Sequence, residues 1–378
     1  MASAFSFGFS GDDIDIDDSE LNGIEDGNVS LPQDNKNELP SLVEARKHDM
    51  KEWVSTLPSQ ISYNRLELNG LPNRAQGKPL SLARREVFDI RTQLMAEDTA
   101  DHENEQLIAG LEKGDIKPQF YEGGFKTWEC ALDLAKLVVS EDHLSGSAGE
   151  SLEGRHIIEL GAGTAVPSLA LFAQLFSEST PSGSQRKSHF TFADYNSAVL
   201  RLVTLPNLLL TWNHIVTAQN SPLAEATSPE GQTEEEEELD ITPELIESFE
   251  KDLASRGITI EFVSGAWSPT FVDLVLSSPE KAKSRTLILA SETIYSPASL
   301  GAFSETLLAL LRATEANTQS RALIAAKRVY FGVGGGVDEF LEVFKGVGGG
   351  ELEVTEQLNI KSEGVGRVVL EIATRSPQ

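Results

Sequence analysis

The most constraining feature of this chain is a stretch in which an apolar strand pattern leads into two closely spaced glycines and then into a helical pattern. Residues 155–160 (Arg-His-Ile-Ile-Glu-Leu) carry an acid, Glu159, just before Gly161 and Gly163, and an apolar helical pattern covers 166–176. Glycine permits a tight turn and the close approach of a ligand, and the free N–H groups at a helix start favour a polar ligand. The stretch predicts the nucleotide-binding turn of a doubly wound α/β sheet.

The turn favours one kind of cofactor over another. A dinucleotide fingerprint has a third glycine three residues after the second, but this chain has Val166 there, which disfavours NAD or NADP. Glu-Leu-Gly-x-Gly-Thr resembles the first motif of class I S-adenosylmethionine methyltransferases, in which the acid lies near the cationic methionine end of the cofactor. An ordinary strand-to-helix turn with a solvated Glu159 is the alternative.

Strand and helix patterns alternate from about residue 116 to the end of the chain. Strand patterns cover 155–160, 189–193, 259–263, 286–290 and 322–326, and two more, at 351–358 and 366–374, follow with no helix between them. Helical patterns cover 127–140, 166–176, 197–210, 298–314 and 337–345. This alternation predicts an α/β fold with a mostly parallel sheet and helices on both faces. The closing pair fits the Rossmann-like, seven-strand fold of class I methyltransferases.

Charge divides the chain into segments. Residues 1–40 carry ten acids against one lysine and are expected to be a disordered tail. Residues 41–115 are expected to be an N-terminal extension of helices and strands, with a helix over 41–57. The methyltransferase domain is expected at 116–378, interrupted by an acidic insertion at 221–255. Its acids are expected to be solvated, or else to steer the enzyme toward a basic partner.

Composition also indicates what the chain does not bind. The formal net charge is −28 and no basic stripe is present, so direct binding of nucleic acid is not expected. The single cysteine, Cys130, excludes an intrachain disulfide and suggests a reducing compartment. The N-terminus does not have the pattern of a signal peptide, and no apolar run reaches the roughly 20 residues needed to span a membrane. No histidine pair has metal-binding spacing. We therefore expect a metal-free, monomeric protein of the cytoplasm and nucleus.

Several polar and aromatic groups follow the predicted strands, at the edge where such sheets bind ligands. The carboxylate of Asp194, after the second strand, suits two ribose hydroxyls, and a helix cap is its alternative role. Trp267, after the third strand, is expected to border an adenine or to pack in the core. The glycines and indole of 123–130 cover a ligand or join the core. Segment 291–295, after the fourth strand, is expected at the edge of the substrate cleft, and the glycines of 330–336, after the fifth strand, are expected to shape the substrate groove or to be only a flexible loop.

Together these segments resemble the protein-histidine N-methyltransferases that modify a large-subunit ribosomal protein. The matching segments are Tyr-Glu-Gly-Gly-Phe-Lys-Thr-Trp-Glu-Cys (121–130), Glu-Leu-Gly-Ala-Gly-Thr (159–164), Asp-Tyr-Asn-Ser-x-Val (194–199), Thr-Leu-Pro-Asn (204–207), Ser-Gly-x-Trp-Ser (264–268), Ser-Glu-Thr-Ile-Tyr (291–295) and Tyr-Phe-Gly-Val-Gly-Gly-Gly-Val (330–337). The glycine motif is shared by many methyltransferases, and the last two segments are much more specific.

The resemblance implies S-adenosyl-L-methionine as the cofactor and a basic substrate, a large-subunit ribosomal protein. It implies cofactor contacts at Thr127, Trp128, Glu129, Cys130, Ala131, Glu159, Gly161, Gly163, Asp194, Tyr195, Asn196, Gly265, Ala266, Trp267 and Ser291. Related lysine methyltransferases carry Asp-x-x-Tyr where this chain has Glu292-x-x-Tyr295. The difference favours histidine as the acceptor. Methylation of lysine and a non-catalytic binding scaffold are the alternatives.

A histidine acceptor needs little activation. Neutral imidazole is already a nucleophile near pH 7, because its unperturbed pKa is about 6.5, whereas lysine must first lose a proton. Catalysis is then expected to depend on in-line positioning of nitrogen, methyl and sulfur. One group must hold the second ring N–H, and the candidates are Glu292, Tyr295 and Asn196.

Overall fold

The computed structural model describes residues 42–69, 79–97, 107–108, 123–141, 154–177, 187–220, 237–313, 320–361 and 365–374. Residues 41–378 form one compact unit. The predicted tail at 1–40 and the first part of the acidic segment, 221–236, lie outside the described residues. The division into an extension at 41–115 and a domain at 116–378 therefore stays a prediction.

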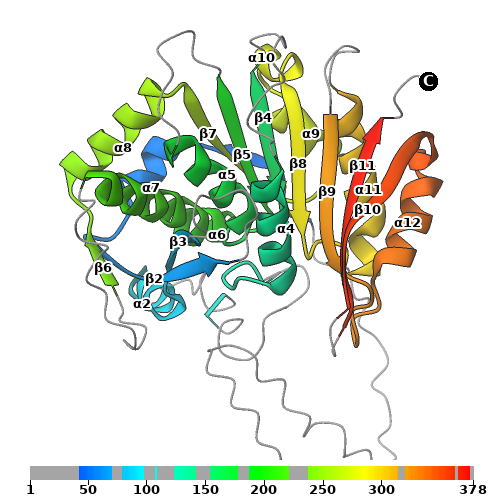
Figure 1. Ribbon diagram of the computed structural model, residues 1–378, viewed down its shortest axis with the longest axis horizontal. Helices are drawn as coiled ribbons and strands as arrows, with labels where there is room; N and C mark the ends of the chain where they lie inside the picture. The colour runs from blue at the N-terminus through cyan, green and yellow to red at the C-terminus, as the bar shows by residue number, and fades with distance from the viewer. Residues whose placement is uncertain are drawn as a thin grey trace, which may run out of the picture. The chain divides into compact units, whose positions relative to one another are not determined.

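The largest sheet in the described part of the chain has eight strands in the order β1-β7-β5-β4-β8-β9-β11-β10 (Figure 1). Their bounds are β1 Arg46–His48, β4 Arg155–Leu160, β5 Ser188–Asp194, β7 Ile258–Ser264, β8 Arg285–Ser291, β9 Ser320–Lys327, β10 Leu352–Ile360 and β11 Arg367–Thr374. The five strands from β7 to β9 are parallel, and β10 and β11 are an antiparallel pair at one edge. The predicted seven-strand fold is confirmed, and β1 adds an antiparallel strand beyond β7.

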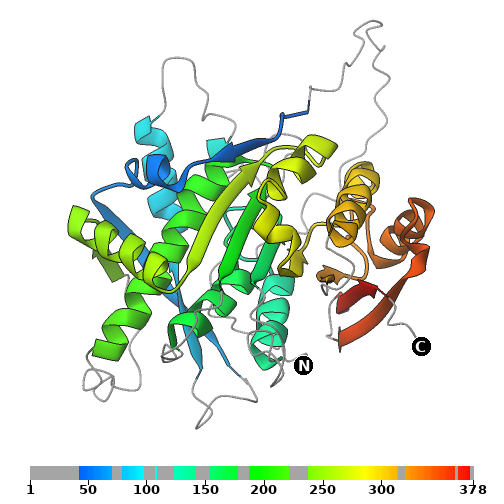
Figure 2. The same ribbon diagram turned by 90° about the horizontal axis from the view of Figure 1, so that it is seen from above.

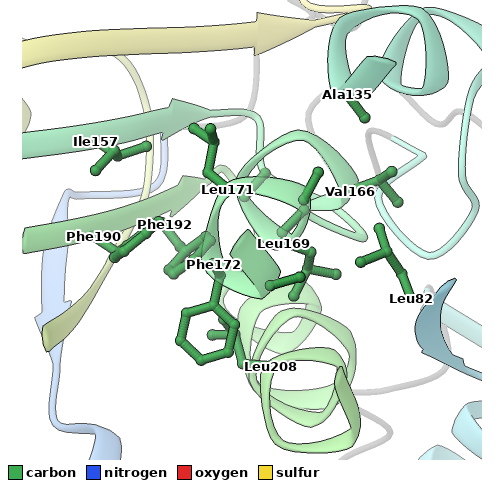
Figure 3. Close-up of a cluster of buried hydrophobic side chains, with 14 of the residues drawn as sticks. Leu82, Ala135, Ile157, Val166, Leu169, Leu171, Phe172, Phe190, Phe192 and Leu208 are labelled. Carbon is green, nitrogen blue, oxygen red and sulfur yellow. The ribbon is translucent and has the colours of Figure 1, made fainter. Parts of the chain in front are cut away.

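Helices cover both faces of this sheet, as predicted. Successive side chains of a buried strand point to opposite faces, so in β4 Ile157 packs in one apolar cluster and Ile158 in the other. The first cluster joins the sheet to α4 Glu129–Ser140, α5 Val166–Ser177 and α7 Leu205–Asn220 (Figures 1 and 3). The second joins it to α9 Pro269–Val275, α11 Pro297–Arg312 and α12 Val337–Gly346. None of the described helices is long and apolar enough to cross a membrane.

A second sheet unites the N-terminal region with the acidic segment. Its strands, in the order β3-β2-β6, are β3 Leu80–Arg85, β2 Gln60–Leu68 and β6 Glu237–Asp240. The carboxylate of Glu237, at the end of the glutamate run, lies 2.5 Å from Arg65 Nε and accepts a hydrogen bond from the Tyr63 hydroxyl at 2.9 Å. The sheet packs on α7 through Ile61, Ala83 and Leu210. The acids at 225–252, within the acidic insertion, were expected only to be solvated. That expectation is wrong for the C-terminal part of this range.

The end of the acidic segment folds because apolar residues are spaced among its acids. After β6, Thr242 caps α8 (Pro243–Ser255), its hydroxyl accepting from Leu245 N at 3.2 Å. Phe249 and Leu253, four residues apart, share one helix face and are buried against the first cluster. The high charge of the segment hides this helical pattern in the sequence.

The helix expected over 41–57 is mostly absent from the described residues of that range. Only α1, Met50–Val54, is helical, because Asp49 caps it by accepting from Lys51 N at 2.9 Å. The residues before it form β1, which pairs with the free edge of β7. A short strand that depends on a distant partner leaves no periodic pattern of its own.

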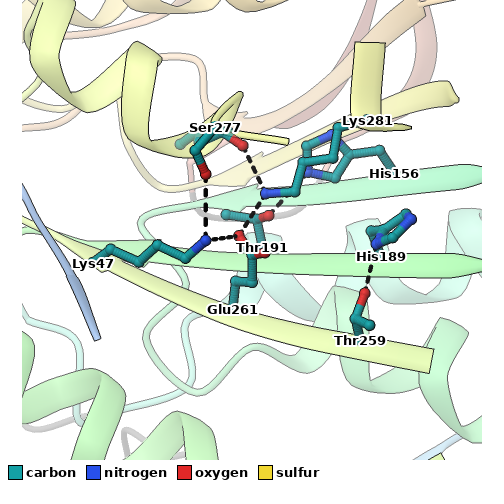
Figure 4. Close-up of polar contacts among 9 residues, drawn as sticks. Lys47, His156, His189, Thr191, Thr259, Glu261, Ser277 and Lys281 are labelled. Atoms are coloured by element: carbon teal, nitrogen blue, oxygen red, sulfur yellow. Dashed lines mark hydrogen bonds and ion pairs between the residues drawn. The ribbon is translucent and has the colours of Figure 1, made fainter. Parts of the chain in front are cut away.

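An ion cluster stabilises β1 on the edge of the sheet (Figure 4). Lys47 of β1 lies 2.9 Å from the Glu261 carboxylate of β7. On its other side, Glu261 meets the buried ammonium of Lys281, in α10 (Pro279–Ala282), at 2.5 Å, and this ammonium also donates to Val275 O at 2.8 Å. Burial lowers the pKa of Lys281, and the hydrogen bonds to the ammonium form oppose that shift. The cluster fixes the segment that carries Leu42.

The helical stretch after β5 contains a π-turn with an identifiable cause. The stretch begins as α6, Ser197–Val199, passes through a π-helical turn, Leu200–Thr204, and continues as α7. Pro206 has no N–H to donate to the carbonyl of Leu202, four residues earlier. The Arg85 guanidinium supplies the missing donor, its Nη1 lying 2.9 Å from Leu202 O. A side chain of β3 thus completes the backbone hydrogen bonding of the main domain.

We expect the Arg85→Met variant to lose about 3 kcal/mol of unfolding free energy, because a buried carbonyl and the paired Asp89 both lose a partner. Arg85 is 2% exposed and its Nε donates to Asp89 at 2.7 Å. Urea denaturation at 25 °C measures the change. The control is Arg84→Met, since Arg84 bonds only to Asn64 among the interactions of its side chain described here, and its cost should stay within about 0.5 kcal/mol. Equal costs for the two variants would contradict this role of Arg85.

Candidate active site

The carboxyl ends of the parallel strands surround a cavity of about 300 Å³. Small-molecule sites begin at about this size. The loops after β4, β5, β7, β8 and β9 all contribute to its wall, as does the segment before α4. Of the predicted site residues, the cavity is lined by Trp128, Ala131, Gly161, Gly163, Asp194, Tyr195, Ala266, Trp267, Ser291, Glu292 and Tyr295.

The glycine turn after β4 forms part of this wall with bare backbone. Gly161 and Gly163 have φ values of 65° and 51°, in the left-handed region that glycine enters without strain. A Cβ atom on Gly161 would lie 2.8 Å from Thr293 Cγ2, and one on Gly163 would lie 3.1 Å from Gly124 O. The turn therefore needs glycine for its conformation and for the space beside it.

Two buried polar residues of the stretch after β5 hold the glycine turn in place. The hydroxyl of Thr204 donates to Gly163 O at 2.7 Å, and Asn207 Nδ2 donates to Thr164 O at 3.1 Å. Both residues belong to the Thr-Leu-Pro-Asn segment (204–207), but no role for either was expected from the sequence. Pro206 between them was the available signal, because a proline inside a helical pattern leaves carbonyls that other groups must satisfy.

Asp194 joins the turn to the next strand. Its Oδ2 accepts from Gly163 N at 3.0 Å, and its Oδ1 accepts from Asn196 N at 3.1 Å. A carboxylate has about four acceptor positions, so it can also receive hydroxyl donors from the cavity. Asn196 precedes α6 as its N-cap residue and is not among the residues of the cavity wall. The residue expected to bind the ribose, Asp194, and the residue that caps the helix, Asn196, thus lie two positions apart.

Glu159 lies behind the turn and not on the cavity wall. Its Oε2 accepts from Ser168 N at the start of α5 at 3.0 Å, and its Oε1 is buried without a hydrogen-bond partner. Burial raises the pKa of Glu159 to about 8, against the weaker opposing effect of Ser168. A nearby cationic group would favour its ionised form.

The remaining predicted contact residues do not line the cavity, and they support the residues that line it. Thr127 Oγ1 donates to Thr164 Oγ1 at 3.0 Å, and Gly265 N donates to Asp194 O at 3.1 Å. The Glu129 carboxylate lies 3.8 Å from Lys327 Nζ. Cys130 is buried beside Glu292. These residues shape the cavity from behind.

Glu292 and Tyr330 form the polar end of the cavity wall. Glu292 directly follows β8, and its Oε2 accepts a hydrogen bond from the hydroxyl of Tyr330, which follows β9. The ring of Tyr295 lies edge-on to that of Tyr330, with 6.2 Å between the centroids. Lys327, which no sequence motif indicated, also lines the cavity, its Nζ 5.7 Å from the centroid of the Trp128 ring. Within the described ranges, no group of His, Cys, Asp or Glu side chains could hold a metal ion.

A parallel sheet with this strand order, and with the glycine turn at the end of its central strand, defines a class I methyltransferase. No family model matches the chain. Histidine protein methyltransferase 1 of Schizosaccharomyces pombe is 33% identical over 340 residues, which cover 90% of this chain and 84% of that relative. The protein of the same name from Saccharomyces cerevisiae is 32% identical over 355 residues and 89% of each chain. The chain therefore belongs to the histidine protein methyltransferase family.

More distant comparisons add less. The Bos taurus homolog is 32% identical over 266 residues, which cover 70% of this chain and 58% of that homolog. A solved structure of M. capricolum TrmK with S-adenosyl-homocysteine is 10% identical, covers 66% of this chain and 69% of that one, and has a TM-score of 0.30, too low to support an argument.

As a member of this family, the protein is an S-adenosyl-L-methionine-dependent methyltransferase, and the residues present fit that cofactor. Gly161 and Asp194 both line the cavity, and the Asp194 carboxylate offers acceptors for ribose hydroxyls. The apolar surface of Ala266 and Trp267 suits an adenine ring. The individual cofactor contacts stay predictions.

Asp194→Asn should weaken binding of S-adenosylhomocysteine about tenfold, measured by calorimetry. The amide would set an N–H donor against Gly163 N or Asn196 N, and such a mismatch costs roughly 1–3 kcal/mol. The control is Asp252→Asn in α8, whose carboxylate also accepts two N–H donors, from Trp212 and Arg256. An affinity equal to that of the control would remove Asp194 from the cofactor site.

Proposed function

We propose that the protein transfers the methyl group of S-adenosyl-L-methionine to a ring nitrogen of a histidine in a protein substrate. The observation that carries this proposal is Glu292, which lines the same cavity as the glycine turn and has one buried carboxylate oxygen, Oε1, without a hydrogen-bond partner in the described part of the chain. An imidazole with a proton on one nitrogen supplies the donor that this oxygen lacks. The names of the two fungal relatives support histidine as the acceptor.

The reaction depends mainly on the placement of the acceptor histidine. The cofactor supplies a methyl group already activated on a sulfonium. Glu292 accepts the N–H of one ring nitrogen, so that the lone pair of the other nitrogen is free to attack in line. Tyr295 lines the same wall and limits the positions that the ring can take. Asn196, the third candidate, is the least favourably placed, since it is not part of the wall.

The surface around the cavity supports a macromolecular substrate. Exposed apolar side chains belong to segments that line the cavity: Leu42 is 66% exposed and Val333 44%, both line it, and Phe331, 78% exposed, directly follows the lining residue Tyr330. A grouping of exposed apolar residues marks a contact surface. We infer that the chain flanking the acceptor histidine lies against the cavity mouth.

The net charge of −28 further supports a basic partner. We propose a large-subunit ribosomal protein, met by a monomeric enzyme in the cytoplasm or nucleus. Nucleic acid as a direct ligand is disfavoured by the same charge.

One experiment tests the function. Extract from Saccharomyces cerevisiae cells that lack their own histidine protein methyltransferase 1 is incubated with the enzyme and methyl-labelled cofactor. The labelled proteins are then identified and hydrolysed for amino-acid analysis. Label on methylhistidine in a ribosomal protein is the expected result. Label on methyllysine would overturn the proposal, and methylhistidine in other proteins alone would overturn the ribosomal substrate.

Glu292→Gln should lower turnover in this assay at least about tenfold, as when a proton-orienting group is lost. Binding of S-adenosylhomocysteine should not change. The control is Glu237→Gln, because Glu237 also accepts from a tyrosine hydroxyl but lies in the second sheet. Full turnover of the Glu292 variant would remove this residue from the reaction.

Phe331→Ser should raise the apparent KM for extract proteins by about fivefold, the effect of losing part of the roughly 1.5–3 kcal/mol that a buried phenylalanine contributes. A dilution series of the extract measures it, and the rate at saturation should be unchanged. Phe88→Ser is the control, because Phe88 is 75% exposed on α2 (Val87–Glu97) and does not line the cavity. Identical values for both variants would exclude a contact at Phe331.

A further inference from the structure

We propose that Tyr330 is a positioning residue that fixes the Glu292 carboxylate and thereby determines which ring nitrogen of the acceptor is methylated. The inference rests on the proposed function, and it concerns a residue that makes no transfer itself. Four features carry it: the backbone of Glu292, the hydrogen bonds of the Tyr330 hydroxyl, the buried thiol of Cys130, and the rigidity of the loop that carries Tyr330.

The backbone of Glu292 is held in an unusual conformation. Its φ is 56°, in the left-handed region that non-glycine residues rarely adopt. The sheet maintains this conformation, because Glu292 N donates to Ala325 O of β9 at 2.9 Å. Such strain is found where a side chain must be held in one direction. The main chain therefore sets where the carboxylate lies, and side-chain partners set how it is turned.

The hydroxyl of Tyr330 determines the rotation of the Glu292 carboxylate. It accepts a hydrogen bond from the backbone N–H of Lys327 at 3.2 Å. A backbone N–H can only donate, so the single hydroxyl hydrogen is free for Glu292 Oε2. Burial, and then the negative charge of Glu292, raise the pKa of Tyr330 well above its usual value. The phenol stays protonated over the working pH range and remains a donor.

Cys130 adds a second protonated neighbour. Burial raises the pKa of its thiol far above the usual value, and the charge of the Glu292 carboxylate and a hydrogen bond to it add to the effect. The thiol therefore carries no charge that would repel the carboxylate. By distance and angle, Tyr330 bonds to Oε2, and Oε1 has no hydrogen-bond partner among the residues that the structure describes.

The loop that carries Tyr330 is closely held. Tyr330 N donates to Gly335 O at 3.0 Å, and a bridge joins Val329 to Gly336. A Cβ on Gly335 would lie 2.1 Å from Tyr295 O, so the loop packs directly on the segment after Glu292. Tyr330 is thus fixed relative to the carboxylate that it orients.

The consequence is control of the reacting nitrogen. The flanking chain at the cavity mouth fixes where the ring is attached, so an imidazole that also gives its N–H to a fixed Oε1 can present only one of its two nitrogens to the methyl group. If the carboxylate could rotate, both oxygens would accept, and the ring could bind in two orientations. A freely turning Glu292 should therefore give both ring-methylated isomers, whereas the Tyr330-bound form should give one.

The test is Tyr330→Phe, assayed in the yeast extract by the ratio of the two methylhistidine isomers. We expect a single isomer from the unchanged protein, a mixture from the variant, and turnover lowered about tenfold, with S-adenosylhomocysteine affinity kept within about twofold. Tyr63→Phe is the control, since it removes the same kind of hydrogen bond, to Glu237, in the second sheet. One isomer at unchanged rate from Tyr330→Phe would overturn the inference. Label on lysine would overturn the proposed function together with it.

A double variant separates positioning from a loss of structure. In Glu292→Gln, the Tyr330 hydroxyl donates to the amide oxygen and turns the NH₂ group toward the ring, where it cannot accept a proton. In the Tyr330→Phe background the amide is free to flip. Glu292→Gln should therefore cost much less turnover there than in the native background. Independent, multiplied losses would contradict a positioning role, and urea midpoints of all four proteins verify that each is folded.

Discussion

The hydrogen bonding of one interrupted helix holds the cofactor turn in its shape. Pro206 lacks the N–H that would bond to Leu202 O, and the chain forms a π-turn there. In this arrangement Thr204 and Asn207 donate hydrogen bonds to the carbonyls of Gly163 and Thr164. Arg85 completes the arrangement from outside, bonding to Leu202 O through its guanidinium and to Asn207 Oδ1 through its backbone N–H. The left-handed turn is thus fixed by groups that lie behind it, while its open side remains available to a ligand.

This arrangement also gives the N-terminal region a physical role. The second sheet is joined to the main domain through Arg85 and through its packing on α7. A change in the second sheet can therefore alter the cofactor turn without touching the cavity. Separately, Leu42, in the segment before β1, lines the cavity, and Lys47 and Lys281 hold β1 beside β7 through their ion pairs with Glu261. Two separate parts of the N-terminal region thus reach the active site by different routes.

The elements that could be predicted from sequence are those whose signals are local. The run 155–160 coincides with β4, because a buried strand bounded by polar residues carries its own pattern, and the closing pair appears at β10 and β11. Two of the elements that escaped prediction show the physical reasons. The three residues of β1 are a strand only because β7 offers a free edge, and β6 lies within a glutamate run that resembles a solvated segment. Residues that belong to a contiguous motif, such as Asp194, could be identified from the sequence. The pairing of Tyr330 with Glu292 depends on the adjacency of β8 and β9, so it could not be predicted from either segment alone.

The pairing of early strands with late ones has a consequence for how the chain is made. Strand β2 needs β6 beside it, with Tyr63 opposite Glu237, and β1 needs β7, with Arg46 opposite Ser264. During synthesis from the N-terminus, both early strands leave the ribosome long before their partners exist. Contacts between residues so far apart in sequence form late and slow folding. Until residue 264 has emerged, this chain exposes two strand edges that other chains could pair with, so its most vulnerable period comes before its cofactor site exists.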